Sequence, residues 1–489
     1  MKNKICFSIT LTCFLFTNLF SQEKISAEKL QEDFAILKKA VYTIHPGLYK
    51  YHDEAYVANN FNLLEHKCQE DLTLNEAFIA FSKCVANIKC GHTLVNPFNQ
   101  NDIIKNGIID KADKLPFTLE IFNDRIFIVK NLSQESAIKK GSEIIAINGF
   151  TAASIIDSLL TIVSADGSNH ANRINILQLT GQGYFETFDS YFAVFFPAQE
   201  ESYTVSVRAP NEEKINNFKI KTISRGERFA RMEKKYGPIP NSYDDLWEFK
   251  VLDKSVGYLK LGTFVTYKMK LNWKKFIDDA FQEIKEKEIE QLIIDIRGNG
   301  GGMSDVSLYL GRYLVEKPIE IIGMKTKIKY ETIPDELRKY MSTWDDSFYN
   351  HKGKVVADGE GYFVNKNEKT DNVKIKPDKN NFKGKKWLLV DAANSSATFT
   401  MAKAFKENKI ATLVGTPTGG NKKGINGGGM FFLTLPNSNI EVDIPIYGYY
   451  PLEAQPDEGV TPNVIIPRTP ENIWMGTDPV LDYVMKETN

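Results

Sequence analysis

Residues 292–302 read Leu-Ile-Ile-Asp-Ile-Arg-Gly-Asn-Gly-Gly-Gly, and this stretch decides the fold of the second half of the chain. The apolar run Leu292–Ile296 is typical of a strand that is buried on both faces. The glycines that follow allow positive φ and expose backbone N–H groups, which favours the binding of an anion or oxyanion. A helical pattern begins at Ser304. The stretch therefore predicts a strand, an anion-binding turn and a helix.

Strand and helix patterns alternate on both sides of this stretch. The predicted elements are strands at Gly257–Leu261, Trp387–Val390 and Ala411–Gly415, and helices at Trp273–Lys285, Ser304–Val315 and Ala397–Asn408. Such alternation predicts an α/β sandwich with a largely parallel sheet. We therefore expect residues 225–489 to form one α/β domain, with the polar, Lys-rich residues 323–385 as an insertion.

Two other patterns precede this domain. Residues 22–109 predict a helical module, because apolar residues recur at helical spacing, as in the stripe of Leu30, Phe34, Leu37 and Val41. Residues 110–224 predict a β domain, because short apolar runs flank turn signals such as Asn-Gly at 148–149. The chain is thus expected to be a multi-domain α/β protein.

Residues 1–21 have the pattern of a cleaved secretory signal, because two lysines precede an apolar run that ends at Ser21. We expect an exported protein, periplasmic or extracellular, and a lipid anchor at Cys13 is the less favoured form. No later stretch is long and apolar enough for a stable membrane span. Export allows one disulfide among the remaining cysteines, which are Cys68, Cys84 and Cys90.

The composition excludes several classes of function. The 61 Lys and Arg balance 62 Asp and Glu, so no electrostatic basis exists for a nucleic-acid partner. The six His form no H-x-x-x-H unit, and C-x-x-C is absent, so we expect no metal. The glycine turn contains neither G-x-G-x-x-G nor Gly-Lys-Ser/Thr, which argues against a nucleotide. We expect no cofactor.

A second stretch has the chemistry of acyl transfer. Residues 391–398 read Asp-Ala-Ala-Asn-Ser-Ser-Ala-Thr and join the strand that ends at Val390 to the next helix. A serine at a helix start lies where the helix dipole favours developing negative charge, and the following amide can donate to an oxyanion. Serine is also a preferred N-cap. From this stretch alone, a nucleophile and a structural cap both remain open.

The two stretches, in this order, resemble the C-terminal-processing peptidases and the tricorn core peptidase. That family reads D-x-R-x-N-x-G-G and then S-A-S-A-S-E, and the matching text here is residues 295–302 and 394–398, with Thr398 and Phe399 in place of the final Ser-Glu. Residues 412–420 are similar to the family's V-G-E-P-T-x-G, and residues 459–463 to its G-I-x-P-D.

The region before the catalytic part resembles a PDZ domain, which the family carries in the same place. Residues 137–149 are similar to the wording A-x-x-G-D-x-I-x-x-I-N-G. Lys114-Leu115-Pro116-Phe117 stands where PDZ domains have their carboxylate-binding loop, but Pro116 lacks an N–H donor. We expect this PDZ-like domain to pack or gate rather than to bind C-termini.

The resemblance implies a serine peptidase acting on peptides or unfolded proteins. Ser396 takes the nucleophile's place, and the amides of Ala397 and of Gly301, or alternatively Gly300, hold the oxyanion. The tricorn-type base is a histidine before the PDZ domain, which here is His92.

Two further assignments stay open. Ser-Lys members of the family place a lysine directly after T-x-G, where this chain has Asn421, so Lys422 or Lys423 is the alternative base. A histidine base needs a carboxylate to orient it, and the family supplies a Glu near G-I-x-P-D. The candidates are Glu458, Glu453 and Asp457, of which we take Glu458.

Three functions remain open on this basis. The first is an active serine peptidase. The second is a peptide-binding protein without activity, because the family's lysine and Ser-Glu are changed. The third is an esterase that uses the same serine.

Overall fold

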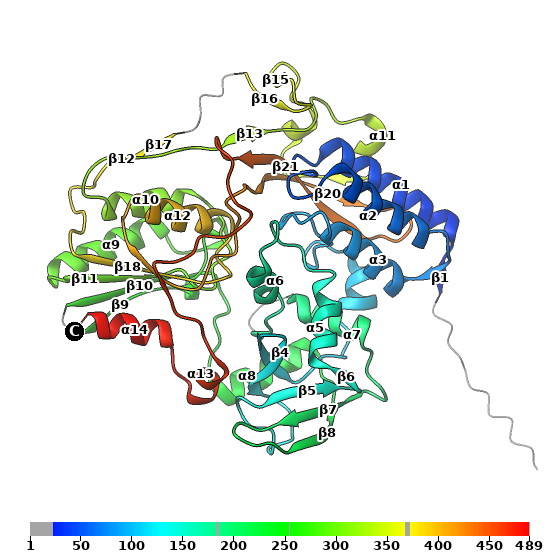
Figure 1. The fold of residues 1–489 in the computed structure, drawn as a ribbon, viewed down its shortest axis with the longest axis horizontal. Helices are drawn as coiled ribbons and strands as arrows, with labels where there is room; N and C mark the ends of the chain where they lie inside the picture. Colours follow the sequence, from blue (N-terminus) through cyan, green and yellow to red (C-terminus); the bar gives the residue numbers. More distant parts are fainter. Residues whose placement is uncertain (1–22, 182–184, 254, 367–371, 489) are drawn as a thin grey trace, which may run out of the picture.

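The computed structural model describes residues 23–181, 185–253, 255–366 and 372–488. The expected secretory signal at 1–21 lies outside the described residues. The second half of the chain is built on a six-stranded sheet (Figure 1). Its order and bounds are β22 Val464–Ile465, β19 Thr412–Gly415, β18 Lys385–Val390, β11 Gln291–Asp295, β10 Val256–Leu261 and β9 Trp247–Asp253.

The described strands of this sheet run parallel, except that β9 is antiparallel to β10. The expectation of a largely parallel sheet is therefore confirmed. Apolar side chains of three helices cover one face: α9 Trp273–Glu286, α10 Asp305–Leu314 and α12 Ser396–Glu407. Helix α14, Pro479–Glu487, packs against the other face through Val480 and Val484. The result is a layered α/β arrangement.

The first part of the chain is helical. Its elements are β1 Lys24–Ile25, α1 Ala27–Ile44, α2 Glu54–Lys67, β2 Leu72–Thr73, α3 Leu74–Ala86, α4 Asp102–Ile104 and the π-helix η1 Lys105–Ile109. The predicted stripe of α1 is buried. Thr73 and Glu76 form the reciprocal bonds of a capping box at the start of α3.

A second, antiparallel sheet follows in the order β3-β4-β5-β7-β8. One hairpin turns at Asn148-Gly149, as the sequence indicates, and another turns at Asn123-Asp124; all four residues have positive φ. The elements are β3 Phe117–Phe122, β4 Arg125–Asn131, β5 Glu143–Ile147, β6 Phe150–Thr151, α5 Ala152–Leu160, α6 His170–Ile176, α7 Thr187–Phe195, β7 Ser202–Arg208, β8 Ile215–Lys221 and α8 Arg225–Tyr236.

A long hairpin that the sequence patterns did not indicate joins these parts. Strands β20 Asn426–Thr434 and β21 Glu441–Tyr450 pair with each other and with two short strands, in the order β13-β21-β20-β14. Apolar residues of the hairpin share one core with the N-terminal helices and the second sheet. No boundary in this core therefore separates residues 22–109 from residues 110–224.

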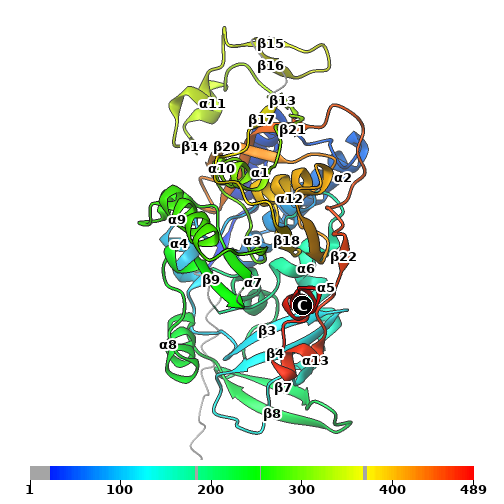
Figure 2. The same ribbon diagram turned by 90° about the vertical axis from the view of Figure 1, so that its left-hand side faces the viewer.

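Part of the expected insertion, between Ile328 and Val355, packs on this hairpin, whereas Ile375 and Phe382 belong to the core of the parallel sheet. Buried Ile328, Tyr330 and Phe348 belong to the same core. Strand β12, Ile319–Ile321, precedes the region, whose own short elements are β13 Lys325–Lys327, α11 Asp335–Arg338, β14 Met341–Ser342, η4 Asp346–Tyr349, β15 Val355–Ala357, β16 Phe363–Asn365 and β17 Val373–Ile375. Figures 1 and 2 place β15 and β16 at the opposite end of the molecule from β7 and β8.

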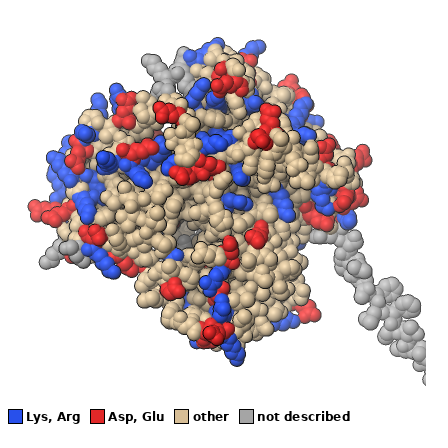
Figure 3. All heavy atoms as spheres, in the orientation of Figure 1, with Lys and Arg blue, Asp and Glu red and all other residues tan. Residues whose placement is uncertain are grey.

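Charge and cysteines complete the description. Lys and Arg lie interspersed with Asp and Glu on the face in Figure 3. Cys68, Cys84 and Cys90 are free and buried, so the structure holds no disulfide among them. Of the helices within the described ranges, none is long and apolar enough to cross a bilayer.

Candidate active site

The two stretches with acyl-transfer chemistry meet at one edge of the central sheet. Strands β11 and β18 are parallel neighbours, with Asp295 opposite Leu389 in the register. The carboxyl ends of parallel strands lie at the same edge, so the turns that follow the two strands are adjacent. One turn is the glycine-rich loop 296–302, and the other is the loop that enters α12.

The glycine-rich loop is held from inside by Asn299, which is fully buried. Its side-chain amide donates to the Leu261 carbonyl at 2.7 Å, and its Oδ1 accepts the Gly301 N–H at 2.9 Å. Gly302 has φ +131°, and a Cβ there would overlap the Phe264 carbonyl. Glycine is therefore required at 302 both by conformation and by space.

A charged cluster fixes the entry to this loop. Arg297 binds Asp295 and also binds Asp478 at 2.7 Å and 2.8 Å. Asp295 is buried and also accepts a bond from Tyr258 at 2.8 Å. Both residues are thus engaged in shaping the loop.

Asp391 ties the two turns together. Its carboxylate accepts the N–H of Gly298 at 2.9 Å and that of Ala393 at 3.0 Å. Burial raises the pKa of Asp391 to about 6, and these two N–H donors act against that rise. A second link is the buried Asn394 side chain, which donates to the Ile296 carbonyl.

Ser396 is the first residue of α12 and has the left-handed conformation, with φ +50°. A non-glycine residue pays roughly 1–2 kcal/mol for that conformation, and such strain gathers at functional sites. The N-cap is Ser395, whose hydroxyl donates to the Gly300 carbonyl at 2.9 Å instead of capping the helix. The ordinary N-cap role therefore does not account for Ser396.

The expected oxyanion residues lie beside Ser396. A Cβ on Gly301 would lie 2.8 Å from Ser396 Cβ and 3.1 Å from the Ala397 nitrogen, so the absence of a side chain keeps this space open. The Ala397 N–H is in the first turn of α12, where amides lack helical partners. The Gly301 N–H is already bonded to Asn299. Gly300 precedes it on the exposed side of the loop.

His92 is half-buried on the segment that follows α3. Its Nδ1 is buried and has no hydrogen-bond partner within the described residues. A Cβ on Gly427 of β20 would lie 3.5 Å from His92 Nε2, so the ring packs against this strand. The part of the chain that the structure describes contains no hydrogen bond between His92 and Ser396.

The segment 419–427 runs from the Ser396 helix to His92. At one end the Gly419 N–H donates to the Asn394 carbonyl at 2.8 Å, and a Cβ on Gly420 would overlap the Phe399 ring of α12. At the other end Gly427 packs on His92. The serine and the histidine therefore flank one continuous stretch of backbone.

The two lysines that are the alternative bases contact residues other than Ser396. Lys422 forms an ion pair with Glu458 at 2.8 Å. The Lys423 ammonium lies 5.8 Å from the centre of the Tyr51 ring. Asn421, at the family's lysine position, is fully buried and donates to the Asp166 carbonyl at 3.1 Å.

The three carboxylates that are candidates to orient His92 are either exposed or bonded to other residues. Glu458 is 54% exposed in its pair with Lys422, and Glu453 is exposed. Asp457 accepts the Ser168 N–H at 2.9 Å and a bond from the Asn421 amide. These hydrogen bonds lower the pKa of Asp457 although burial acts to raise it.

Sequence reasoning did not consider Asp166, which lies in the loop after α5. Its Oδ1 accepts the N–H of Gly91, the residue next to His92, at 2.9 Å. Nothing in the local sequence indicates this, because the contact joins two loops that are distant along the chain. Within the described residues, no group of three or more His, Cys, Asp or Glu is arranged to hold a metal ion.

Comparisons with known proteins find a peptidase family for part of the chain. Residues 255–466 match peptidase family S41. The carboxy-terminal processing protease CtpB of Bacillus subtilis (strain 168) is 28% identical over 173 residues, which are 35% of this chain and 26% of that protein. The chain thus aligns with about a quarter of the length of this curated relative.

Solved structures with a similar fold include mature CPAF. Its complex with lactacystin has a TM-score of 0.62 and 15% identity, covering 94% of this chain and 97% of that one. Mature CPAF alone has a TM-score of 0.60 and 16% identity, covering 94% and 96%. The region 255–466 thus matches peptidase family S41 and is similar in part to a carboxy-terminal processing protease.

Proposed function

We propose that this chain is a serine peptidase in which Ser396 is the nucleophile and His92 the base. The observation that carries the proposal is the strained left-handed conformation of Ser396. The residue lies at a strand–helix junction beside a glycine-lined space. Both belong to a region that matches a peptidase family. Its proposed substrates are peptides or unfolded proteins, in keeping with the partial similarity to a carboxy-terminal processing protease.

In this proposal the Ser396 hydroxyl attacks the carbonyl carbon of the scissile bond. His92 takes the hydroxyl proton and returns it to the leaving amine. The oxyanion accepts the Ala397 N–H and the Gly300 N–H, because the Gly301 N–H is engaged with Asn299 in this conformation. Water then hydrolyses the acyl-enzyme.

The ion pair of Lys422 argues against the Ser-Lys alternative. Its ammonium is engaged with the Glu458 carboxylate at 2.8 Å, so this pair would have to break before Lys422 could act on Ser396. We therefore favour His92 over Lys422 and Lys423. The proposal includes export, on the basis of the signal pattern at 1–21.

We also propose that residues 110–224 are a PDZ-like domain whose peptide groove is occupied by the chain itself. A PDZ domain binds its ligand as an added strand at a sheet edge. Here β3 is an edge strand, and Leu119 exchanges backbone hydrogen bonds of 2.8 and 3.1 Å with Leu179 in antiparallel orientation. The Gln178 side chain accepts the Ile121 N–H at 2.7 Å. A peptide would have to displace this segment.

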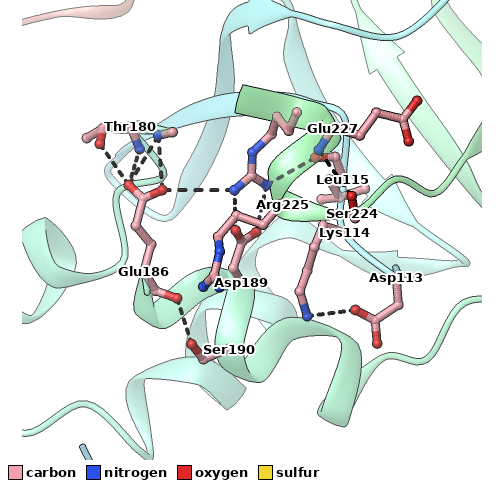
Figure 4. Close-up of polar contacts among 12 residues, drawn as sticks. Asp113, Lys114, Leu115, Thr180, Glu186, Asp189, Ser190, Ser224, Arg225 and Glu227 are labelled. Carbon is pink, nitrogen blue, oxygen red and sulfur yellow. Dashed lines mark hydrogen bonds and ion pairs between the residues drawn. The ribbon is translucent and has the colours of Figure 1, made fainter. Parts of the chain in front are cut away.

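A buried charge cluster anchors the occupying segment. Glu186 accepts hydrogen bonds from the Thr180 N–H at 2.7 Å and from the Gly181 N–H, and Figure 4 shows its carboxylate directed at Thr180. Arg228, which is 1% exposed, binds Asp189 through two hydrogen bonds and lies within 4.0 Å of Glu186. These contacts support a closed groove in the resting protein.

Proteolysis tests the proposed activity. Wild type, Ser396→Ala and His92→Gln are incubated with a denatured protein and with a matched peptide ester. The proposal predicts that only the wild type cleaves the denatured protein at an appreciable rate. Turnover of the ester alone would instead favour the esterase. Absence of both activities would favour a binding protein without activity.

A further inference from the structure

The loop after α5 runs alongside the segment that carries His92. Ser164 donates to the Thr93 carbonyl at 2.7 Å, and the Gly167 N–H donates to the Lys89 carbonyl at 2.9 Å. Between these two bonds, the Gly91 N–H donates to Asp166 Oδ1. A Cβ on Gly91 would lie 3.1 Å from Asp166 Oδ2, so glycine at this position lets the carboxylate approach the backbone next to His92.

Asp166 is 3% exposed, and a buried carboxylate stays ionised only when charges or hydrogen bonds compensate its lost hydration. Burial raises the pKa of Asp166, and three features oppose that rise: the charge of His92, the Gly91 N–H and the charge of Lys50. The hydrogen bond from the Gly91 N–H places the Asp166 carboxylate against the backbone next to His92.

Lys50 supplies the buried countercharge. It is 7% exposed, and its ammonium donates to the Ile425 carbonyl at 2.9 Å and to the Tyr449 carbonyl at 3.0 Å. Burial lowers the pKa of Lys50 to about 8. Other titratable groups that act on this cluster include Cys90, from the His92 segment, and His45, Tyr51, Lys423, Tyr450 and Asp457.

A group that orients His92 must form a hydrogen bond with one of its ring nitrogens. Its Nδ1 has no partner within the described residues, although it is buried. Such a nitrogen costs roughly 1–3 kcal/mol unless a partner approaches. The three carboxylates near the family's closing motif are exposed or bonded to other groups. Asp166 is a buried carboxylate that is bonded to the residue next to His92.

We propose that Asp166 is the positioning residue of this site, which accepts the Nδ1–H of His92 and so takes the part that the family gives to a downstream Glu. The inference rests on the proposed function. With the proton on Nδ1, the bare Nε2 takes the Ser396 proton. The Asp166 carboxylate then stabilises the imidazolium without becoming protonated. In the proposal, a small rotation of the His92 ring from the conformation described here makes the bond, with or without substrate.

Asp166→Asn tests this role and conserves the acceptor for the Gly91 N–H. We expect kcat to fall by roughly 10²- to 10⁴-fold with little change in KM. We also expect the acid limb of kcat/KM against pH to move down by about one unit or more, because the anion that stabilises the imidazolium is lost. A purely structural role would leave that limb in place.

Asp457→Asn is the matched comparison, because Asp457 lies near the same loop and its amide analogue keeps an acceptor for Ser168 and Asn421. Its acid limb should coincide with that of the wild type. A shift with Asp457→Asn and none with Asp166→Asn would overturn the assignment. Ser396→Ala tests the proposed function separately from the role of Asp166. Activity that survives this change contradicts the proposed function itself.

A measurement on the wild-type protein covers the case in which Asp166→Asn does not fold. Nitrogen NMR of protein labelled at histidine, assigned with His92→Gln, reports which ring nitrogen carries the proton. The proposal predicts neutral His92 with its proton on Nδ1. A proton on Nε2 would exclude acceptance by Asp166.

Discussion

Gly301 is the position at which the geometry of the site can be tested most quantitatively. In Gly301→Ala, the new Cβ would lie 2.8 Å from Ser396 Cβ, 3.0 Å from the Ser395 carbonyl oxygen and 3.1 Å from the Ala397 nitrogen. The φ of +110° adds about 1–2 kcal/mol of backbone strain for a residue with a side chain. Overpacking adds about 1–3 kcal/mol. We expect a total loss of about 2–5 kcal/mol in the free energy of unfolding.

Gly298→Ala is the control in the same loop. Gly298 also has positive φ, at +76°, but a Cβ there meets no atom within 4 Å. This variant should therefore lose only the strain of about 1–2 kcal/mol and keep its activity. Urea unfolding measures the stabilities, and the rate of labelling by a serine-directed phosphonate measures the site. Equal stability and equal labelling in the two variants would refute the packing described here.

Three other changes have defined outcomes. Ser396→Gly and Ser396→Ala should both be inactive, but the glycine variant should be more stable by about 1 kcal/mol in urea unfolding, because glycine adopts φ +50° without strain. Arg297→Gln should cost about 3–5 kcal/mol in the same assay, since it leaves the buried Asp295 without its partner; a loss below 1 kcal/mol would contradict this. The pKa of Lys50 is about 8 when folded and 10.5 in its ordinary state, so the unfolded chain binds more protons between these values. The stability of the wild type relative to Lys50→Met should therefore rise from pH 8 to pH 10.5, and a fall would show that the ammonium is favourably placed.

Much of the central sheet could be predicted from sequence because its strands are buried on both faces. Strands β11 and β18 are short apolar runs with turn residues at their ends, and helices α9 and α12 have a clear apolar face. The hairpin of β20 and β21 could not be predicted in this way. Three consecutive glycines, 427–429, interrupt the apolar pattern of β20 with a register shift.

Only part of the site could be predicted, because the sequence indicates which residues follow adjacent strands but not which distant loops reach them. The serine stretch and the glycine loop follow adjacent strands, so their proximity follows from the topology of a parallel sheet. The left-handed φ of Ser396 leaves no trace in the sequence. Asp166 and Lys50 reach the His92 region from distant loops, and a single carboxylate or lysine in a loop looks the same whether it is solvated or buried.

The most direct test of the central claim is chemical labelling of the folded protein by a fluorophosphonate, with the modified residue located by mass spectrometry. The account predicts one modified serine, Ser396, with labelling lost in Ser396→Ala and slowed in His92→Gln. No labelling of the wild type, or equal labelling of Ser396→Ala, would contradict the assignment of the nucleophile.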